Sequence, residues 1–541
     1  MKNLLFVILI TAFLLRFWGI WNLDIFGDAS AYAFRSIGYI DYLGTSFQTQ
    51  PIDWYQNSPL PSWTKLSFHD HPPLVFIIQN LFFRIFGDSL ISARLPGITF
   101  GTASVFFIFL LVKKFLAGET LALLASFLFA VNLAMVWISR SALMEPIFIF
   151  LVLVNIYLFF RFLEDQKFWL YFGITLGLIA LTKYIGVFLI PVYFSYLFFG
   201  LIHPINRISP ISTKVILRSW RFYAAFLIAL LVFSPVIIYN FYLYQVRGHF
   251  DLQIAYFLGQ DTPEWTGLLG KIQSPFTDIG KNLPGLYGWP MLIMALFGLS
   301  YWTYKTYWTY KPHYFFFFYL FFSTLLFMKI GVADRFIALY GPIFVILAAI
   351  AAGQFWKGYF GKLAVIVFLI WEVVFSINKN LINLPDYGIA KLDNYFEQEF
   401  QNKESAVIPE SDNVNLNGII RKFAARETQN PPFLFLIVYN DNIALSTLQW
   451  IFYRRFFYHG MPVMYVENFE KILSDYGLDY FGGFDIYFVQ STENTLLNPF
   501  KTQKTAGLAL ENNLLTSGLR PAKIISGHDD LEMFRVYKFN F

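Results

Sequence analysis

Cysteine is absent from this sequence of 541 residues, and charged residues are scarce. Without cysteine the chain forms no disulfide bonds, although this leaves its redox compartment undetermined. Charged side chains make up 14% of the residues and hydrophobic ones 57%, whereas an ordinary soluble domain carries roughly 25% charged residues. This composition excludes a water-soluble globule for most of the chain. The net charge of +5 is small and spread over loops, so nucleic-acid binding is not indicated.

The hydrophobic residues form nearly uncharged runs of roughly 15 to 20 residues, the length that crosses the hydrocarbon core of a bilayer. We expect about eleven membrane-spanning helices. They lie near residues 4–21, 97–112, 118–137, 147–161, 168–182, 185–202, 222–241, 286–304, 314–328, 336–352 and 363–377. Arg16, Phe17 and Trp18 stand where a signal-peptide cleavage site would need small residues, so we expect the first run to be retained as a helix.

Lysine and arginine residues predict the orientation of these helices. If the N-terminus is cytoplasmic, the basic residues of the short loops all lie on the cytoplasmic side, as the positive-inside rule requires. These residues are Lys113, Lys114, Arg161, Lys167, Arg207, Lys214, Arg218, Arg221, Lys305, Lys311, Lys357 and Lys362. The long first outer loop, 22–96, also carries basic residues, but loops beyond about 60 residues largely escape the rule. Within this loop, residues 74–86 are apolar but short, which predicts a re-entrant or interfacial helix.

The composition changes after residue 377, where polar residues become common and apolar runs shrink to strand length. We expect strands at 433–439, 462–466 and 485–489, with helices at 443–457 and 468–476. The sequence thus predicts a polytopic α-helical membrane domain at 1–377 and a soluble α/β domain at 378–541. With the orientation above, the soluble domain is extracytoplasmic and the protein is a multi-pass protein of the cell membrane.

Two polar motifs stand in the first outer loop. Asp28 follows the first span in the segment Phe-Gly-Asp-Ala-Ser-Ala-Tyr, and it would be either a functional carboxylate or a solvated acid or helix N-cap. Further on, His69 and His71 flank an aspartate. Two histidines beside a carboxylate are consistent with a divalent-metal site, although the spacing is not diagnostic.

Four more charged residues lie at the predicted outer ends of helices. Arg140 and Glu145 stand between the third and fourth spans, where they would also suit a neighbouring ion pair. Lys183 lies between the fifth and sixth spans and Arg335 precedes the tenth. Such a gathering at one water–lipid boundary suits an anionic lipid headgroup, because cations bind a phosphate and a carboxylate takes a proton from an attacking hydroxyl. The pattern therefore predicts transfer of a group from a lipid phosphate.

Several short motifs resemble the polyprenyl-phosphate-sugar-dependent glycosyltransferases of the GT-C membrane fold, which include protein O-mannosyltransferases and aminoarabinose transferases. The motifs run in family order through residues 1–350. They are Phe26-Gly27-Asp28 with Tyr32, His71-Pro72-Pro73-Leu74, Ala93-Arg94-Leu95-Pro96-Gly97, Ser139-Arg140-Ser141-Ala142-Leu143-Met144-Glu145-Pro146, Gly177-Leu178 with Leu181-Thr182-Lys183-Tyr184, and Arg335-Phe336 with Pro342.

The resemblance implies an inverting transferase that moves a sugar from a polyprenyl-phosphate carrier to a hydroxyl acceptor on protein, lipid or glycan. Asp28 matches the catalytic acid of the first loop, expected to act as general base, and Glu145 matches a second acid of the same cavity. The implied residues for binding the carrier and its phosphate are Lys183, Arg335, Arg140, Arg94, His71 and Tyr32. The family includes metal-assisted and metal-free members, so a divalent metal at Asp28, Glu145, His69 and His71 stays open.

Two departures from the family pattern limit what carries over. Many members have a second acid directly after the first-loop aspartate, where this chain has Ala29, and the aminoarabinose branch tends to have lysine where this chain has His71. A neutral imidazole anchors a phosphate less well than an ammonium does, which argues against that particular substrate. A different class also remains open, because paired charges in a helix bundle are typical of a transporter or flippase of a lipid-linked anion.

Overall fold

The computed structural model describes residues 2–39, 67–115, 118–202, 213–260, 262, 276–306, 312–400, 435–440, 442–459, 461–497 and 506–541. Residues 40–66 of the predicted outer loop 22–96, together with Arg207 and Lys311, lie outside these residues. The chain divides into two compact units. The first comprises residues 1–18, 41–78 and 94–383, and the second comprises 19–40, 79–93 and 384–541.

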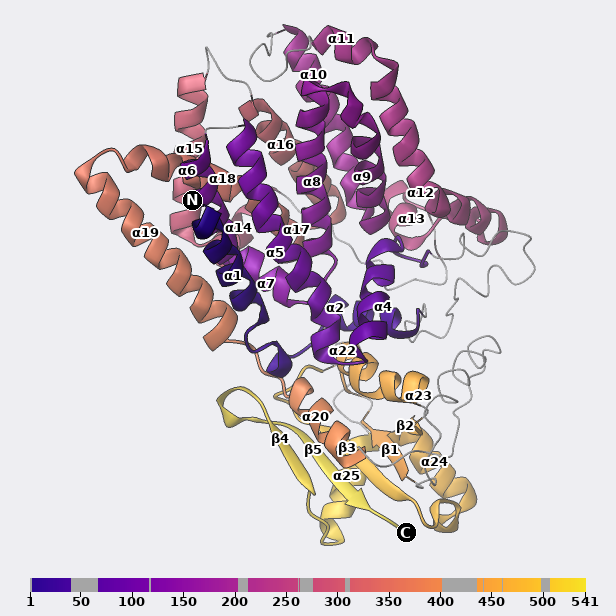
Figure 1. The fold of residues 1–541 in the computed structure, drawn as a ribbon. Coiled ribbons are helices and arrows are strands. Elements are labelled where there is room, and N and C mark those ends of the chain that lie inside the picture. Colours follow the sequence, from indigo (N-terminus) through magenta and orange to yellow (C-terminus); the bar gives the residue numbers. More distant parts are fainter. Residues whose placement is uncertain are drawn as a thin grey trace. The chain divides into compact units, whose positions relative to one another are not determined.

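Helices make up the first unit (Figure 1). Two of them, α4 (Leu74–Phe86) and α5 (Leu90–Phe115), are shared with the second unit. The others are α1 (Lys2–Phe17), α6 (Glu119–Val131), α7 (Leu133–Arg140), α8 (Glu145–Glu164), η3 (Gln166–Phe168), α9 (Trp169–Thr182), η4 (Tyr184–Phe188), α10 (Leu189–Ile202), α11 (Thr213–Arg218), α12 (Trp220–Arg247), α13 (Leu252–Leu258), α14 (Phe276–Tyr287), α15 (Trp289–Thr306), α16 (Pro312–Ile330), α17 (Asp334–Ile337), η6 (Ala338–Tyr340), α18 (Gly341–Phe355), α19 (Tyr359–Ile377) and η7 (Asn378–Ile382).

Among the described residues, seven helices are long and apolar enough to cross a membrane, or up to nine if each of two bent pairs counts as one span. Every predicted span coincides with a helix, which confirms a polytopic α-helical membrane protein. The predicted number of eleven is not confirmed. The spans expected at 168–182 and 314–328 fall on α9 and α16, which are not among the helices that meet this test.

Glycines allow two pairs of these helices to pack with their backbones in close contact. A Cβ atom on Gly173 of α9 would lie 2.4 Å from the carbonyl oxygen of Ala225 on α12, and one on Gly298 of α15 would lie 1.9 Å from that of Leu347 on α18. In lipid, helices associate through van der Waals packing, which small residues at the interface permit. These glycines therefore define the contacts of α9 with α12 and of α15 with α18.

The second unit contains a five-stranded sheet with the order β2-β1-β3-β5-β4. Strand β1 pairs in parallel with β2 and β3, whereas β5 pairs in antiparallel fashion with β3 and β4. The elements of this unit are η1 (Ile20–Asn22), α2 (Asp28–Gly38), α20 (Ile389–Phe400), β1 (Phe435–Tyr439), α22 (Leu445–Thr447), η8 (Leu448–Tyr453), α23 (Arg454–His459), β2 (Val463–Tyr465), α24 (Val466–Tyr476), η9 (Leu478–Phe481), β3 (Asp485–Ser491), α25 (Ala506–Thr516), β4 (Lys523–Ser526), η10 (His528–Asp530) and β5 (Glu532–Phe539).

The three strands and two helical stretches predicted for this domain are present, each within a few residues. Every residue of β1 is buried, which explains why its sequence is apolar throughout instead of alternating. The strands β4 and β5 and the helices α20 and α25 were not predicted, since their sequences mix charged and apolar residues. The division of the chain after residue 377 stays a prediction.

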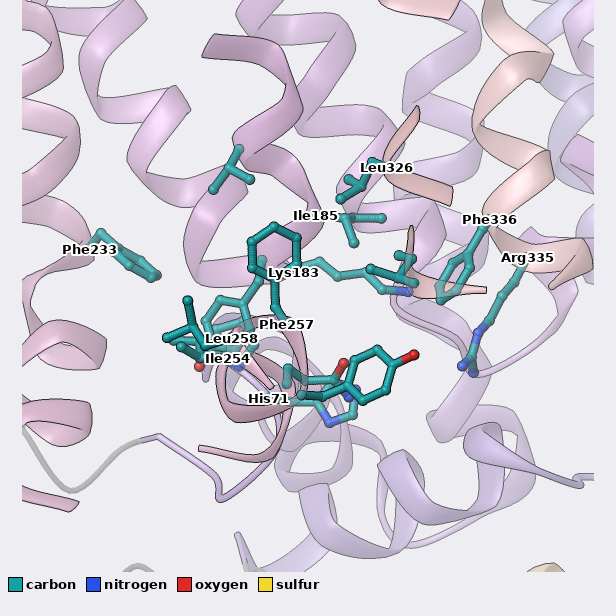
Figure 2. Close-up of a pocket in the computed structure, with 16 residues that line it drawn as sticks. His71, Lys183, Ile185, Phe233, Ile254, Phe257, Leu258, Leu326, Arg335 and Phe336 are labelled. Carbon is teal, nitrogen blue, oxygen red and sulfur yellow. The ribbon is translucent and has the colours of Figure 1, made fainter. Parts of the chain in front are cut away.

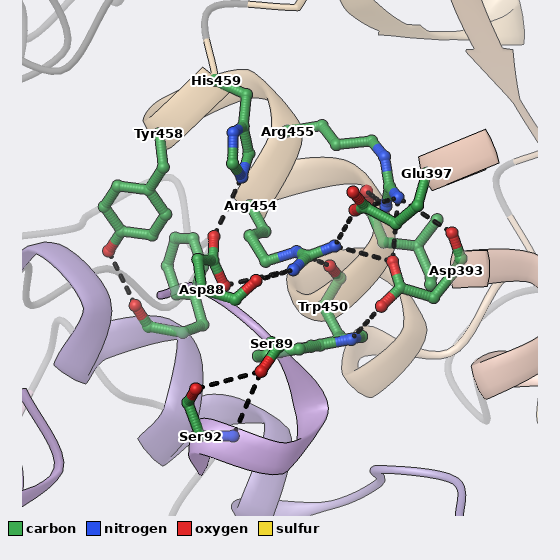
Figure 3. Close-up of polar contacts among 12 residues, drawn as sticks. Asp88, Ser89, Ser92, Asp393, Glu397, Trp450, Arg454, Arg455, Tyr458 and His459 are labelled. Carbon is green, nitrogen blue, oxygen red and sulfur yellow. Dashed lines mark hydrogen bonds and ion pairs between the residues drawn. The ribbon is translucent and has the colours of Figure 1, made fainter. Parts of the chain in front are cut away.

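A cluster of charged side chains, most of them buried, holds segments of the second unit together (Figure 3). The guanidinium group of Arg454 donates hydrogen bonds to Asp88 at 3.1 Å, to Asp393 at 2.7 Å and to Glu397 at 2.8 Å. His459 Nε2 lies 2.9 Å from Asp88 Oδ2. Burial by itself raises the pKa of Asp88, but Arg454 and His459 outweigh that effect and lower it to about 2. The cluster therefore joins the 79–93 segment to the two helices α20 and α23.

We expect the substitution Arg454→Met to destabilise the second unit by about 3–5 kcal/mol, because it removes the cation that Asp88 and Asp393 share and leaves them with His459 and Arg455, respectively. This loss is measured by heating the purified full chain in detergent and recording protease cleavage within residues 384–541 as the readout of unfolding. Arg520→Met removes an exposed arginine of the same unit and should leave the midpoint unchanged. Equal midpoints for Arg454→Met and the unaltered chain would contradict the stabilising role of the cluster.

Candidate functional site

Glu145 and Lys183 form a buried ion pair in the first unit. Glu145 is the first residue of α8, next to Pro146, and its side chain has no exposed surface. Lys183 follows the last residue of α9, and its ammonium group hydrogen-bonds to Glu145 Oε1. An uncompensated buried carboxylate would be strongly disfavoured, so the lysine is what permits the acid to occupy this position.

Arg335 adds a second cation to this pair. It lies on the short helix α17, and its Nε is 4.0 Å from Glu145 Oε1. Lys183 Nζ and the Arg335 guanidinium carbon lie 4.6 and 5.1 Å from the ring centre of Phe336. Two cations against one carboxylate give the cluster of Glu145, Lys183 and Arg335 a net charge of about +1 when all three are ionised, which favours an anionic ligand.

The two cations of this cluster line a cavity of about 310 Å³. Figure 2 shows Arg335 and Phe336 on one side, with Phe233, Ile254 and Leu258 on the other. The remaining lining residues are His71, Pro72, Lys183, Tyr184, Ile185, Val187, Gln253, Tyr256, Phe257, Leu326 and Ile330. A cavity with cations at one place and apolar side chains elsewhere suits an amphipathic anion, such as a phosphate on a hydrocarbon chain.

The His69–Asp70–His71 segment reaches the same cavity through His71. His71 Nδ1 lies 2.9 Å from Asp70 Oδ1, and His69 Nε2 lies 3.6 Å from Asp70 Oδ2. In the parts of the chain that the structure describes, no group of three or more His, Asp or Glu side chains is arranged to hold a metal ion. Glu145 is engaged by Lys183 instead. The described donors therefore do not fit a metal site, and metal dependence stays open, as it does from the sequence alone.

Asp28 and Tyr32 belong to the second unit. Asp28 opens α2 directly after Gly27, whose φ of +57° suits glycine at this turn. The helix N-cap is thus Gly27, and the partly exposed Asp28 lies in the first turn, where the helix dipole favours a carboxylate. Tyr32 lies one turn later and is buried. The part that Asp28 plays in catalysis stays a prediction, because it rests on the resemblance.

Arg140 and Arg94 do not line the cavity. Arg140 Nη1 donates hydrogen bonds to the carbonyl oxygens of Leu15 at 3.0 Å and of Trp18 at 2.6 Å, at the end of α1. A cation is stabilised by the unpaired carbonyl groups of a helix C-terminus, so Arg140 has a structural task there. Arg94 is buried in α5. Of the six residues suggested for carrier binding, the structure brings Lys183, Arg335 and His71 together.

Sequence reasoning missed Asp251 and Asn240, which do not line the cavity, and gave no role to Tyr184, which does. Tyr184 was noted only as part of a motif, yet its hydroxyl donates a hydrogen bond to Asp251 Oδ2 at 2.5 Å. Asn240 Nδ2 donates to the same oxygen at 2.8 Å. The available signal was a polar asparagine inside a membrane span, followed eleven residues later by an acid.

Residues 70–239 match the family model described as dolichyl-phosphate-mannose-protein mannosyltransferase, which is less than half of the chain. This segment contains Glu145 and Lys183 but not Asp28 or Arg335. No curated protein sequence matches the chain.

The structure is similar to two solved membrane enzymes. ArnT from Cupriavidus metallidurans in the apo state has a TM-score of 0.55 and 11% identity, covering 99% of this chain and 97% of that chain. The same enzyme bound to undecaprenyl phosphate has a TM-score of 0.52 at 11% identity over the same shares of both chains. The oligosaccharyltransferase of Archaeoglobus fulgidus in the apo form has a TM-score of 0.51 and 13% identity, covering 91% of this chain and 69% of that chain. At such identities the similarity concerns the fold.

These findings confirm the fold class predicted from the sequence, a GT-C type membrane domain with a C-terminal soluble α/β domain. They also confirm the resemblance to GT-C glycosyltransferases that the sequence motifs suggested. A glycosyltransferase is accordingly supported as the class of enzyme.

We expect Lys183→Met to lower the free energy of unfolding by about 3–5 kcal/mol, because it leaves the Glu145 carboxylate buried opposite an apolar group. Adding Glu145→Gln to this variant removes the charge and should recover most of the loss. Thermal unfolding of the detergent-solubilised protein measures both changes. If the double variant is no more stable than Lys183→Met alone, the ion pair does not account for the burial of Glu145.

Proposed function

We propose that this protein is a membrane glycosyltransferase that moves one sugar from a polyprenyl-phosphate carrier to a hydroxyl acceptor. The observation that carries this proposal is the cluster of Glu145, Lys183 and Arg335 beside an apolar cavity. A polyprenyl phosphate has the matching chemistry, with an anionic group joined to a long hydrocarbon chain. The family model concerns proteins that use dolichyl-phosphate-mannose, and one similar structure holds undecaprenyl phosphate, which gives further support.

In the proposed reaction the bond between the anomeric carbon and the phosphate oxygen breaks. The phosphate leaves with the electron pair of this bond, and Lys183 and Arg335 stabilise the charge that develops on it. The acceptor oxygen attacks the anomeric carbon from the opposite face, which inverts its configuration. The carboxylate of Asp28 takes the hydroxyl proton, a role that rests on the resemblance to the family. Glu145 keeps Lys183 in place through their ion pair.

The proposal includes a location for the reaction. By the positive-inside rule the basic loops favour a cytoplasmic N-terminus, and the C-terminal domain would then lie on the extracytoplasmic side, where the acceptor would be found. The acceptor itself would be a hydroxyl of a protein, lipid or glycan, and the donor sugar a hexose or pentose. Protease protection of an epitope tag in sealed vesicles distinguishes this orientation from the reverse one.

We expect Asp28→Asn to reduce sugar transfer by about 10²- to 10⁴-fold, the usual contribution of a general base. Asparagine has nearly the same shape, so the fold should be kept. Purified full-length protein is incubated with radiolabelled polyprenyl-phosphate sugars and membranes, and the labelled product is measured. Asp479→Asn, an exposed acid of the same unit, serves as the matched control.

Full activity of the Asp28→Asn protein would contradict the role of Asp28 as base. Movement of labelled carrier across the vesicle bilayer without any labelled product would favour a flippase over a transferase. Consumption of carriers that bear an oligosaccharide, but not of those with one sugar, would favour an oligosaccharide transferase of the same fold.

We expect Arg335→Gln to weaken the binding of undecaprenyl phosphate by roughly 10- to 100-fold, because a neutral amide replaces a charge-assisted donor. Binding is measured by displacement of a labelled polyprenyl phosphate from the purified protein. Arg218→Gln removes an exposed arginine of the same unit and should leave the affinity unchanged. Equal affinity of the Arg335→Gln and unaltered proteins would exclude this arginine from the phosphate site.

A further inference from the structure

Asp251 lies where three segments that line the cavity meet. These segments are 71–72, 183–187 and 253–258. Asp251 itself is fully buried, does not line the cavity and precedes the helix α13 that forms one of its walls. Asp251 follows the membrane-spanning helix α12. The proposed reaction does not use this buried acid.

Each oxygen of the Asp251 carboxylate accepts two hydrogen bonds. Oδ2 receives those of the Tyr184 hydroxyl at 2.5 Å and of Asn240 Nδ2 at 2.8 Å. Oδ1 receives the backbone N–H groups of Gln253 and Ile254, each at 3.1 Å, and so caps α13. Burial raises the pKa of Asp251, whereas the hydrogen bonds of Tyr184 and Asn240 lower it. Burial is the larger effect, so the pKa of Asp251 lies above its usual range.

These hydrogen bonds connect the charged end of the cavity to its apolar wall. Tyr184 follows Lys183 directly, so its anchored hydroxyl fixes the chain beside the lysine, while Glu145 holds the ammonium group. On the other side, Asp251 fixes the start of α13, whose Ile254, Phe257 and Leu258 face the cavity. Leu252 N–H also donates to the carbonyl oxygen of His69 at 2.8 Å, which ties in the segment that carries His71.

We propose that Asp251 is a positioning residue that holds the helix α13 at a set distance from Lys183. At this distance one carrier lipid contacts Lys183 with its phosphate and α13 with its hydrocarbon chain. The inference rests on the proposed function, because it assumes a polyprenyl phosphate as the ligand of this cavity. Asp251 acts through Tyr184 and through α13, without contact to the ligand.

The first test is Asp251→Asn in the full-length protein. In this variant the NH₂ group of the new side chain takes the place of Oδ2 and faces the NH₂ group of Asn240. Two donors cannot form a hydrogen bond, so the contact between residues 240 and 251 is lost. We expect the KM for the labelled carrier and the dissociation constant for undecaprenyl phosphate to rise about tenfold or more. The kcat at saturating carrier should change by less than about threefold, because the bound lipid restores the spacing of its two contacts.

The second test exchanges the two partners in the double variant Asn240→Asp, Asp251→Asn. This exchange again places an acceptor opposite a donor, and it should return the KM to within about threefold of the unaltered value. Tyr184→Phe should raise the KM as well, whereas Tyr223→Phe, which removes an exposed tyrosine hydroxyl of the same unit, should not. Recovery by the exchange is not expected of a substitution that merely loosens the fold.

An unchanged KM and unchanged binding in Asp251→Asn would overturn the proposal, as would a fall in kcat that the exchange does not repair. Binding of undecaprenyl phosphate is measured independently of sugar transfer. The experiment therefore distinguishes failure of the proposed glycosyltransferase reaction from failure of the positioning role of Asp251. If the unaltered protein transfers no sugar but Asp251→Asn still weakens the binding of undecaprenyl phosphate, the proposed reaction is wrong and the positioning role stands. If the unaltered protein does not bind this lipid, both are wrong.

Discussion

The burial of the Glu145 carboxylate is the constraint on which the site depends. A carboxylate without exposed surface, at the start of a membrane helix, is stable only beside a cation, and Lys183 supplies it from the end of α9. The pair fixes how α8 and α9 meet, and a second cation, Arg335, lies 4.0 Å from the same carboxylate. The charge that makes the cavity suitable for an anion is thus a consequence of how one buried acid is neutralised.

The arginines of the first unit show why only some cations are suited to a ligand. Arg16 donates to the carbonyl oxygens of Ala12 and Ala130, and Arg140 donates to those of Leu15 and Trp18. The carbonyls of Leu15, Trp18 and Ala130 lie at or near helix C-termini, which carry partial negative charge. Arg335 lies instead on a helix of four residues and faces the cavity. Two basic side chains therefore stabilise the helix bundle, and a third contributes charge to the cavity.

Hydropathy predicted the positions of the membrane helices because lipid imposes long apolar runs. The charges at helix ends predicted that Asp28, Arg140, Glu145, Lys183 and Arg335 would gather, and the structure brings the last three of these together. Pairing was harder to predict. Arg140 was considered as a partner of Glu145, five residues away, but it bonds to α1, more than a hundred residues earlier. The contact of Arg454 with Asp88 joins residues 366 apart. A single sequence shows that a charge is costly in lipid, but not which distant group compensates it.

Asp251 illustrates the same limit in a way that bears on function. An acid just beyond a membrane span normally meets water, and in the sequence only the polar Asn240 inside the preceding span distinguishes Asp251 from such a residue. Its burial follows from three donors on different elements, Tyr184, Asn240 and the first turn of α13, that converge on one carboxylate. Because a buried acid is stable only when all these donors are in place, it restricts the relative positions of the elements that carry them. A residue that never reaches the ligand can therefore determine the dimensions of the cavity.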